Sequence, residues 1–185
     1  MNESTKDVTL YSGFIFDLLV NYESSRTTFS AALFEMAEGL DPAHPTTLVP
    51  IALYNKMCSW IEDNFGASNL RLAGSEIGRR VYDMIQSDPS METEPDPLGM
   101  MNQLVSVASE VIQDPQKRGW EILESNPGRI IMRRTQTFNC VLQEGLLQSL
   151  VQHCGVKLVA VRHLRCRREG ADFCDYAISW HSRSS

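Results

Sequence analysis

The sequence has no apolar run near the roughly 18–20 residues that a membrane-spanning helix needs, which argues against a membrane protein. Its first residues are polar and acidic and lack the apolar core of a secretory signal, so a cytoplasmic location is the default expectation. Aromatic residues are few, at 8% of the 185 residues, but hydrophobic residues reach 43%, which is enough for one domain with a full core.

Short catalytic signatures are missing as well. The chain contains no Gly-x-Ser-x-Gly, His-Glu-x-x-His or Asp-x-Asp-x-Asp pattern, and the segment Gly74–Gly78 lacks the lysine and the glycine spacing of a phosphate loop. We also find no pair of side chains with the character of a general acid and a general base. These absences favour a non-catalytic binding or sensory domain over an enzyme.

Cysteine is sparse and odd in number. Five cysteines without a secretory signal argue against a disulfide framework. Two interpretations stay open, namely thiols buried in the core and ligands of a metal ion. The five are Cys58, Cys140, Cys154, Cys166 and Cys174.

The net charge of -6 is unevenly distributed. Residues 1–116 hold 6 basic and 17 acidic side chains, whereas residues 117–185 hold 11 basic and 6 acidic ones. A basic cluster in the second part has no interleaved aromatics and no recognition-helix pattern. The sequence therefore argues against nucleic-acid binding and favours a solvated hairpin tip, docked on the acidic half or on a partner protein. The cluster comprises Arg162, Arg165, Arg167 and Arg168.

Apolar residues at helical spacing fill the first part of the chain, for example in the stretch 50–66. We expect one domain over residues 9–182 behind a disordered segment 1–8. Within that domain we expect a helical part at 9–114 and an α/β part at 117–181.

The second part of the chain shows strand patterns. The runs Trp120–Glu124 and Arg129–Arg133 flank a turn signature at Ser125–Gly128. Residues Phe138–Cys154 have helical spacing, and Cys174–Trp180 alternates as a half-buried strand does. This order predicts an α+β fold, in which a helical N-terminal half packs on a four-stranded, mainly antiparallel sheet with one crossing helix.

The last predicted hairpin carries the most specific pattern. Cys166 and Cys174 stand on either side of its polar, glycine-containing turn, and His163 lies three residues before the first of them. Because paired strands bring such positions close together, a cluster of soft metal ligands can form here.

The motif from Cys166 to Cys174, followed by an alternating strand, resembles the 4-vinyl reductase domain superfamily, most clearly over Trp120–Trp180. That superfamily shares its fold with heme-based nitric-oxide sensors and with subunits of the Golgi-transport tethering complex. In aromatic-effector sensors with such a domain, three cysteines and one acidic residue hold zinc. The resemblance implies zinc at Cys140, Cys166 and Cys174, with His163, a competent zinc ligand, at the acidic position. Buried thiols without metal are the alternative.

The same resemblance gives an expectation about heme. The heme-based sensors need a histidine on a central helix as the axial ligand, and this chain has none between His44 and His153. Their Tyr-x-Ser-x-Arg clamp for the porphyrin carboxylates is also missing, and Arg133–Phe138 occupies roughly that region. The sequence therefore argues against heme and leaves zinc as the candidate cofactor.

A pocket for a small hydrophobic ligand is the other candidate site. Aromatic and methionine side chains can form an adaptable apolar cavity, although simple core packing is the competing interpretation. The apolar surface of the stretch 98–113 is so wide that we expect a homodimer to cover it. The pocket candidates are Trp60, Tyr82, Met100, Met101 and Trp120.

The function that these patterns favour is a non-catalytic sensory or signalling domain. It binds a small apolar ligand, or a metal through its cysteine cluster, and acts through contact with a partner protein. An adaptor module with structural cysteines is the first alternative. A tetrapyrrole-related enzyme or a heme-based gas sensor is the second.

Overall fold

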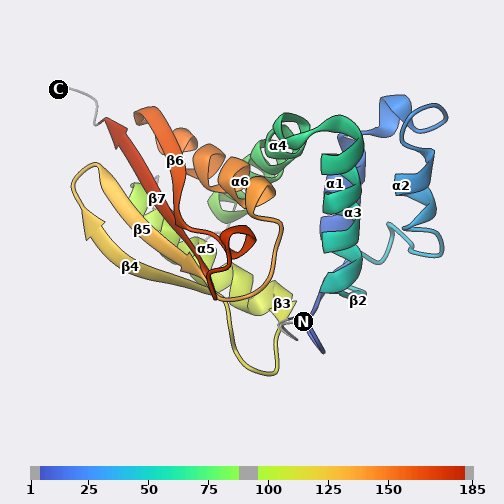
Figure 1. Ribbon diagram of the computed structural model, residues 1–185, viewed down its shortest axis with the longest axis horizontal. Coiled ribbons are helices and arrows are strands. Elements are labelled where there is room, and N and C mark those ends of the chain that lie inside the picture. Colours follow the sequence, from blue (N-terminus) through green and yellow to red (C-terminus); the bar gives the residue numbers. More distant parts are fainter. Residues whose placement is uncertain (1–4, 88–95, 182–185) are drawn as a thin grey trace.

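The computed structural model describes residues 5–87 and 96–181. The chain forms two lobes (Figure 1). An N-terminal lobe over residues 5–65 stands at one end, and a body built from the remaining described residues carries a large sheet. Among the described residues, none of the helices combines the length and the apolarity that crossing a bilayer requires.

The N-terminal lobe is mainly helical, with a small sheet beneath its helices. The sheet has three strands in the order β2-β1-β3, and its third strand comes from the body, so it ties the two lobes together. Gly66, at a φ of 85°, separates the last helix of this lobe from the first helix of the body. The elements are β1 (Thr9–Tyr11), α1 (Gly13–Val20), η1 (Glu23–Ser25), α2 (Ala31–Glu35), β2 (Leu48–Pro50) and α3 (Ile51–Phe65).

The body contains a four-stranded antiparallel sheet in the order β4-β5-β7-β6. One helix, α6, crosses between its two hairpins, which confirms the predicted α+β fold. The elements are α4 (Ala67–Gln86), α5 (Pro97–Val111), β3 (Ile112–Gln113), β4 (Trp120–Asn126), β5 (Arg129–Arg134), α6 (Cys140–His153), β6 (Lys157–Arg165), η2 (Arg167–Glu169) and β7 (Cys174–His181).

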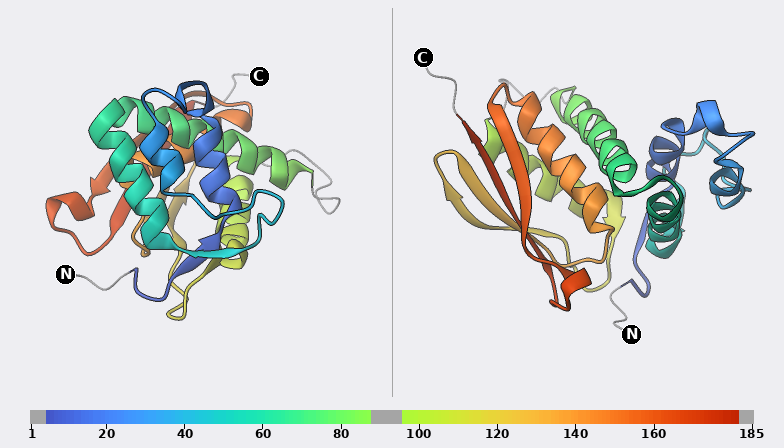
Figure 2. Two further views of the ribbon diagram at one scale, coloured as in Figure 1. Left: turned by 90° about the vertical axis from the view of Figure 1, so that its right-hand side faces the viewer. Right: turned by 45° about the horizontal axis from the view of Figure 1, so that its top comes forward.

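Helices α5 and α6 cover one face of this sheet, and α4 packs on the outer side of α6 (Figure 2). Glycines make the α4–α6 crossing close. A Cβ atom at Gly78 would lie 2.6 Å from the carbonyl oxygen of Leu146, and one at Gly145 would overlap the backbone of Arg71. The two backbones are therefore in direct contact, and α6 is a buried central helix.

Helix α5 gives a different result from the expected homodimer. Met100 and Met101, whose apolar character predicted an interface between two copies, are both fully buried inside the chain. The wide apolar surface of α5 is used within the fold, against α6 and the sheet. Met100 and Met101 therefore give no support to a homodimer, and the homodimer itself stays a prediction.

The first residues also differ in part from the expectation. Of the segment 1–8 that we expected to be disordered, residues 1–4 lie outside the described part of the chain. Val8 is buried, with 2% of its surface exposed, and it precedes β1. The small sheet was not predicted, because strands of two or three residues are too short to show an alternating pattern.

Candidate functional site

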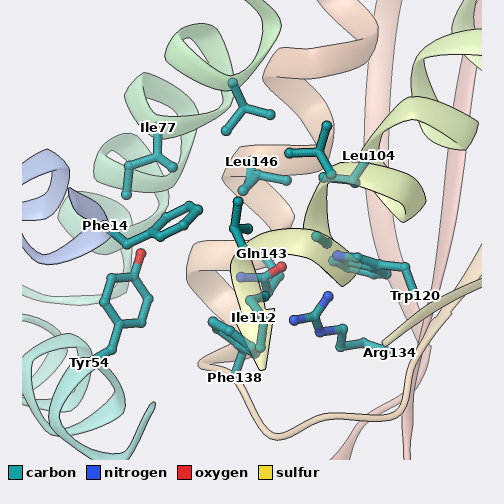
Figure 3. Close-up of a pocket in the computed structure, with 14 residues that line it drawn as sticks. Phe14, Tyr54, Ile77, Leu104, Ile112, Trp120, Arg134, Phe138, Gln143 and Leu146 are labelled. Carbon is teal, nitrogen blue, oxygen red and sulfur yellow. The ribbon is translucent and has the colours of Figure 1, made fainter. Parts of the chain in front are cut away.

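A small cavity lies where α4, α5 and α6 meet the sheet (Figure 3). Its volume is about 40 Å³, room for a few water molecules. Both lobes line it: Phe14 and Tyr54 come from the N-terminal lobe, and Trp120 and Arg134 come from the sheet. Apolar side chains form most of the wall, including Leu104, Val107, Val111 and Ile112.

Arg134 is the one charged residue in this lining. Side chains along β5 alternate in burial, so that Ile130, Met132 and Arg134 face the helices, whereas Arg129, Ile131 and Arg133 face away. The alternation therefore places the guanidinium of Arg134 on the same inward face of β5 as the apolar residues Ile130 and Met132. Only 2% of the Arg134 surface is exposed.

The guanidinium of Arg134 lies against two aromatic rings. Its central carbon is 4.8 Å from the ring centroid of Trp120 and 4.4 Å from that of Phe138. Its Nε and Nη1 atoms are buried and have no hydrogen-bond partner among residues 5–87 and 96–181. Burial lowers the pKa of Arg134 to about 9, although the charge of Asp114 acts in the opposite direction.

Asp114, the acidic residue whose charge acts on Arg134, is already paired with another side chain. Asp114 accepts hydrogen bonds from Arg118 at 2.8 Å and from Gln136 at 3.2 Å, and its side chain is 2% exposed. Two neutral polar side chains, Tyr54 and Gln143, also line the cavity (Figure 3). Among the described residues, the lining is thus mostly apolar and contains one cation, Arg134, and two neutral groups that can form hydrogen bonds.

The five predicted pocket residues are not all brought to this cavity. Trp120 lines it. Trp60 instead packs edge-on against Phe65, and Tyr82 lies against the ring of His153. Met100 and Met101 are buried in the core and are absent from the lining. Our sequence reasoning missed Arg134, although the alternation of β5 was a signal that could have placed it inside.

The second site is the predicted cluster of cysteines and histidine. Cys140 begins α6 directly after Asn139, whose side chain caps that helix by accepting hydrogen bonds from two backbone amides. His163 lies on β6, Cys166 follows that strand, and Cys174 begins β7. The fold therefore brings together residues that are up to 34 positions apart.

The distances within this cluster suit a metal ion. Donor atoms of Cys140, His163 and Cys166 lie within 4.8 Å of one another, and the two sulfur atoms are 3.6 Å apart. Sulfur ligands about 2.3 Å from a tetrahedral ion would be about 3.8 Å from each other. Cys174, whose sulfur accepts a hydrogen bond of 3.5 Å from the backbone amide of Arg167, lies beside this group but is not one of the three residues whose donor atoms are this close together.

A chain of polar contacts orients His163. Its Nδ1 atom lies 2.8 Å from Oε1 of Glu144, and the other carboxylate oxygen of Glu144 accepts a hydrogen bond of 2.6 Å from Arg71. Nε2 of His163 is buried and has no hydrogen-bond partner in the described part of the chain. In metal-bound histidines, one ring nitrogen usually contacts a carboxylate or a carbonyl group and the other binds the metal. The contact of Nδ1 with Glu144 leaves Nε2 of His163 in the second role.

The ionisation of the cluster without a metal is mixed. The hydrogen bond from Cys140, with further help from His163, lowers the pKa of Cys174 to about 4 against the effect of burial. The same hydrogen bond and burial raise the pKa of Cys140. Burial acts to lower the pKa of His163, but Cys174 and Glu144 outweigh it and raise that pKa to about 9. Zinc binds thiolate and neutral imidazole, so the shift of the Cys174 pKa favours a metal, whereas a metal that binds Cys140 and His163 must displace their protons.

One buried side chain connects the two sites. The ring centroid of Tyr176, on β7, lies 4.5 Å from that of His163 and 5.6 Å from that of Trp120. Tyr176 is 1% exposed. The cluster and the cavity are therefore neighbours in one packed core.

No protein-family model and no curated protein matches the chain. Solved structures do match it over almost their whole length. An H-NOX protein from S. oneidensis in the Fe(II)NO ligation state has a TM-score of 0.61 at 15% identity and covers 92% of this chain and 99% of its own. A histidine-to-glycine mutant of an H-NOX domain from Shewanella oneidensis, in the Fe(II)CO ligation state, has a TM-score of 0.67 at 15% identity, with 94% and 99% covered.

A third match comes from a study of heme distortion in the H-NOX family, with a TM-score of 0.57 at 11% identity and with 94% and 95% covered. At these identities the similarity shows the fold. The chain therefore has the fold of H-NOX domains. This agrees with the superfamily suggested by the cysteine motif and does not single out its 4-vinyl reductase branch.

The sequence-based argument against heme is contradicted by these matches, since the proteins that share the fold are described with iron ligation states or with heme. That argument was too narrow, because it relied on two side-chain signatures and not on the fold as a whole. The cavity fits a porphyrin in part: its wall is apolar, and the unpaired guanidinium of Arg134 suits a porphyrin carboxylate. Helix α5 supplies no histidine, and Leu104, Val107 and Ala108 face the cavity instead.

Proposed function

We propose that the chain is a non-catalytic sensory domain that binds heme, or a related apolar ligand, in the cavity between α4, α5, α6 and the sheet. The proposal rests on one observation, namely that residues of both lobes line the cavity. Phe14 and Tyr54 belong to the N-terminal lobe, whereas Trp120 and Arg134 belong to the sheet of the body. A ligand placed between them contacts both lobes, so its arrival or departure changes how the lobes pack.

The matched structures support heme as the candidate ligand. They share the fold along nearly the whole chain, and they are described in Fe(II)NO and Fe(II)CO ligation states. One of them is a histidine-to-glycine mutant in the Fe(II)CO state, so a lost histidine does not by itself argue against an iron–carbonyl complex in this fold. When bound, heme supplies an iron centre that takes a diatomic gas.

This chain's own residues would hold the group by two means. Leu104, Val107 and Ala108 of α5 and the ring of Phe138 offer apolar contact, and Arg134 offers a positive charge. The present volume of about 40 Å³ is far below the roughly 300–1,000 Å³ of typical ligand pockets, so binding requires α5 and the neighbouring side chains to move apart. A partner protein can recognise that structural change by binding one of the two arrangements more tightly.

The test is reconstitution with hemin. The purified chain is incubated with hemin, passed through a desalting column, and examined by absorption spectroscopy before and after reduction and addition of NO or CO. We expect a Soret band that stays with the protein and shifts when the gas is added. If all hemin separates from the folded protein on the column, heme binding is excluded.

A second proposal concerns zinc in the cysteine–histidine cluster. Cys140, His163 and Cys166 have donor atoms within 4.8 Å of one another, and Cys174 beside them would complete three sulfurs and one nitrogen, a common donor set of structural zinc sites. The supporting observation is the unused Nε2 of His163, whose opposite nitrogen contacts Glu144. Zinc there would fasten the hairpin of β6 and β7 to the start of α6, beside the sensory cavity.

A further inference from the structure

The outer face of the four-stranded sheet, which the helices leave uncovered, has a charge pattern that is complementary to itself. We propose that this face binds a second copy of the chain, with the two copies related by a two-fold axis parallel to the strands. The inference does not depend on the proposed function, because the cavity lies on the helix-covered face of the sheet. It also uses a different surface from α5, on which the sequence-based expectation of a homodimer relied.

The register of the sheet shows which side chains lie on the outer face. Helices α5 and α6 pack on one face, and among the described residues no helix packs on the other (Figure 2). Ile130 and Met132 of β5 face the helices and are 0% exposed, whereas Ile131 between them faces outward and is less buried. Because residues paired across neighbouring strands share a face, the partners of Ile131 are outward as well.

These outward side chains form rows that cross the sheet in the strand order β4-β5-β7-β6. One row has charges of alternating sign, and the next has charges only at its two ends. Acidic side chains therefore lie at the β4 edge and basic side chains at the β6 edge. The first row is Glu121, Arg133, Asp175 and Arg165, and the second row is Glu124, Ile131, Ala177 and Arg162.

The inner charges are paired within the chain, whereas the charges at the edges are not. Arg133 donates hydrogen bonds to both carboxylate oxygens of Asp175, at 2.8 and 3.0 Å. In the described part of the chain, neither Arg162 nor Arg165 forms an ion pair. Glu124 and Arg162 are exposed and three strand spacings apart, about 14 Å, so they cannot pair with each other within one chain.

A two-fold axis parallel to the strands gives each of these edge charges a partner. It places β4 of one copy opposite β6 of the other and keeps each row opposite the same row. Glu121 then faces Arg165 of the second copy, and the alternating signs of the first row meet opposite signs throughout. In the second row Glu124 faces Arg162, and the apolar middle of the row faces the same apolar residues of the second copy.

No like charges meet in this arrangement. The third row of the outer face has a single charge, at Arg129, and the axis places it opposite the neutral Ser179 of the second copy. An axis that runs across the strands would instead set β4 on β4 and β6 on β6. Glu124 would then lie near Glu124 of the second copy, and opposed like charges are destabilising. The pattern of charge therefore selects one of the two arrangements.

Two bulges add apolar contact at the same level of the sheet. Leu123 is the additional residue of β4 between the first and second rows, and Leu164 is the additional residue of β6 between the same rows. Their surfaces are 45% and 44% exposed. The two-fold axis that pairs the charges also brings Leu123 opposite Leu164 of the second copy.

The size of the outer face predicts a weak, reversible dimer. Strands about 4.8 Å apart, with about six residues of roughly 3.3 Å each, give a footprint of roughly 400 Å² per copy. That is small beside the roughly 800 Å² of accessible surface that each partner buries in a standard interface. Because much of the attraction is between exposed charges, we expect added salt to weaken the dimer.

The experiment is analytical ultracentrifugation of the full chain from about 1 μM to about 1 mM at low salt. We expect the average mass to rise with concentration from that of one chain towards that of two, and to fall again when salt is added. A wild-type protein that stays monomeric at about 1 mM overturns the proposal, because it excludes a second copy as the occupant of this face.

Charge reversal in the second row tests the arrangement of the two copies. Glu124→Arg and Arg162→Glu should each raise the dissociation constant at least about tenfold, because like charges then face each other twice in every dimer. Mixed in equal amounts, the two variants should associate about as tightly as the wild type, since each reversed charge then meets an opposite one. Glu110→Arg, at an exposed position of α5, makes the same change in net charge and should dimerise like the wild type.

The mixture separates this interface from general effects of the substitutions, because damage to the folding of one variant is not repaired by adding the other. Recovery of the dimer in the mixture supports the two-fold arrangement. If each variant alone associates like the wild type, or if the mixture stays monomeric, the inference is overturned. Retention of hemin by the same samples tests the sensory proposal separately, so either proposal can fail without the other.

Discussion

The guanidinium of Arg168 donates hydrogen bonds to both carboxylate oxygens of Glu62, which is 106 residues earlier in the chain. Arg168 belongs to η2, the turn between Cys166 and Cys174, whereas Glu62 lies on α3 of the N-terminal lobe. Asn139, which caps α6 beside Cys140, donates a third hydrogen bond to Glu62 at 3.0 Å. Residues that flank the cysteine cluster thus form hydrogen bonds with α3 and connect the cluster to the N-terminal lobe.

This ion pair predicts a pH dependence of stability. The hydrogen bond from Arg168 holds the pKa of Glu62 below its ordinary value of 4.5. A lowered pKa in the folded state stabilises the protein above the unfolded value, and that stability is lost as the pH falls. Glu62→Gln should therefore cost about 1 kcal/mol near neutral pH, reduced by the exposure of Arg168, with a difference that shrinks between about pH 5 and pH 3.

Chemical denaturation at several pH values checks this prediction. Asp63→Asn is the matched control, since Asp63 is the exposed neighbour of Glu62 on the same helix. We expect this control to follow the wild-type curve. A Glu62→Gln variant whose deficit stays constant down to about pH 3 would contradict the assigned role of the pair.

The metal proposal predicts about one zinc per chain in carefully purified protein. Cys166→Ser should lose that zinc and loosen the hairpin of β6 and β7. Cys154→Ser is the control, because Cys154 lies at the end of α6 and its sulfur contacts the carbonyl oxygen of Leu150 instead. Elemental analysis decides between them, and equal zinc in both variants would rule the cluster out.

The contact between Glu144 and His163 predicts a graded effect on metal affinity. Glu144→Gln removes the charge that orients the imidazole and should weaken zinc binding about 10–100-fold in competition with a chelator. Arg71→Met removes only the other partner of Glu144 and should weaken zinc binding less. Identical affinities in the wild type and in Glu144→Gln would show that the contact does not support a metal.

The close crossing of α4 and α6 predicts a large loss of stability for a small change. Gly145→Ala puts a methyl group into the backbone of Arg71 and within 2.8 Å of the amide nitrogen of Ser75, so the two helices must separate. We expect a loss of about 2–3 kcal/mol in the free energy of unfolding. Gly119→Ala, with nothing within 4 Å of its added atom, should stay within about 0.5 kcal/mol in the same denaturant titration.

Several parts of this protein followed from periodicity. Helix α3, Ile51–Phe65, lies within the stretch 50–66 where the sequence shows helical spacing, and β4 and β5 flank the predicted turn. Cys140 entered the predicted cluster only through the family resemblance, whereas His163, Cys166 and Cys174 were proposed because cysteine and histidine are rare and stand beside a predicted hairpin turn. These features are local. The pairing of two neighbouring strands brings their residues together, and the spacing of those residues along the sequence reflects that pairing.

Other parts depended on contacts between distant segments. The sequence shows the apolar surface of α5, but it does not show whether α6, the sheet or a second copy covers it; the fold covers it internally. The cavity draws its lining from both lobes, so no single stretch of sequence could reveal it.

By itself, the sequence determined the α+β order of elements and the absence of short catalytic signatures, and it placed His163, Cys166 and Cys174 around one predicted hairpin. The tertiary structure alone decided that Nε and Nη1 of Arg134 have no hydrogen-bond partner among the described residues, and that Arg168 pairs with Glu62. The reason is physical. Hydrophobic periodicity reports which face of an element is buried, whereas the pairing of a charge depends on what a different element places opposite it.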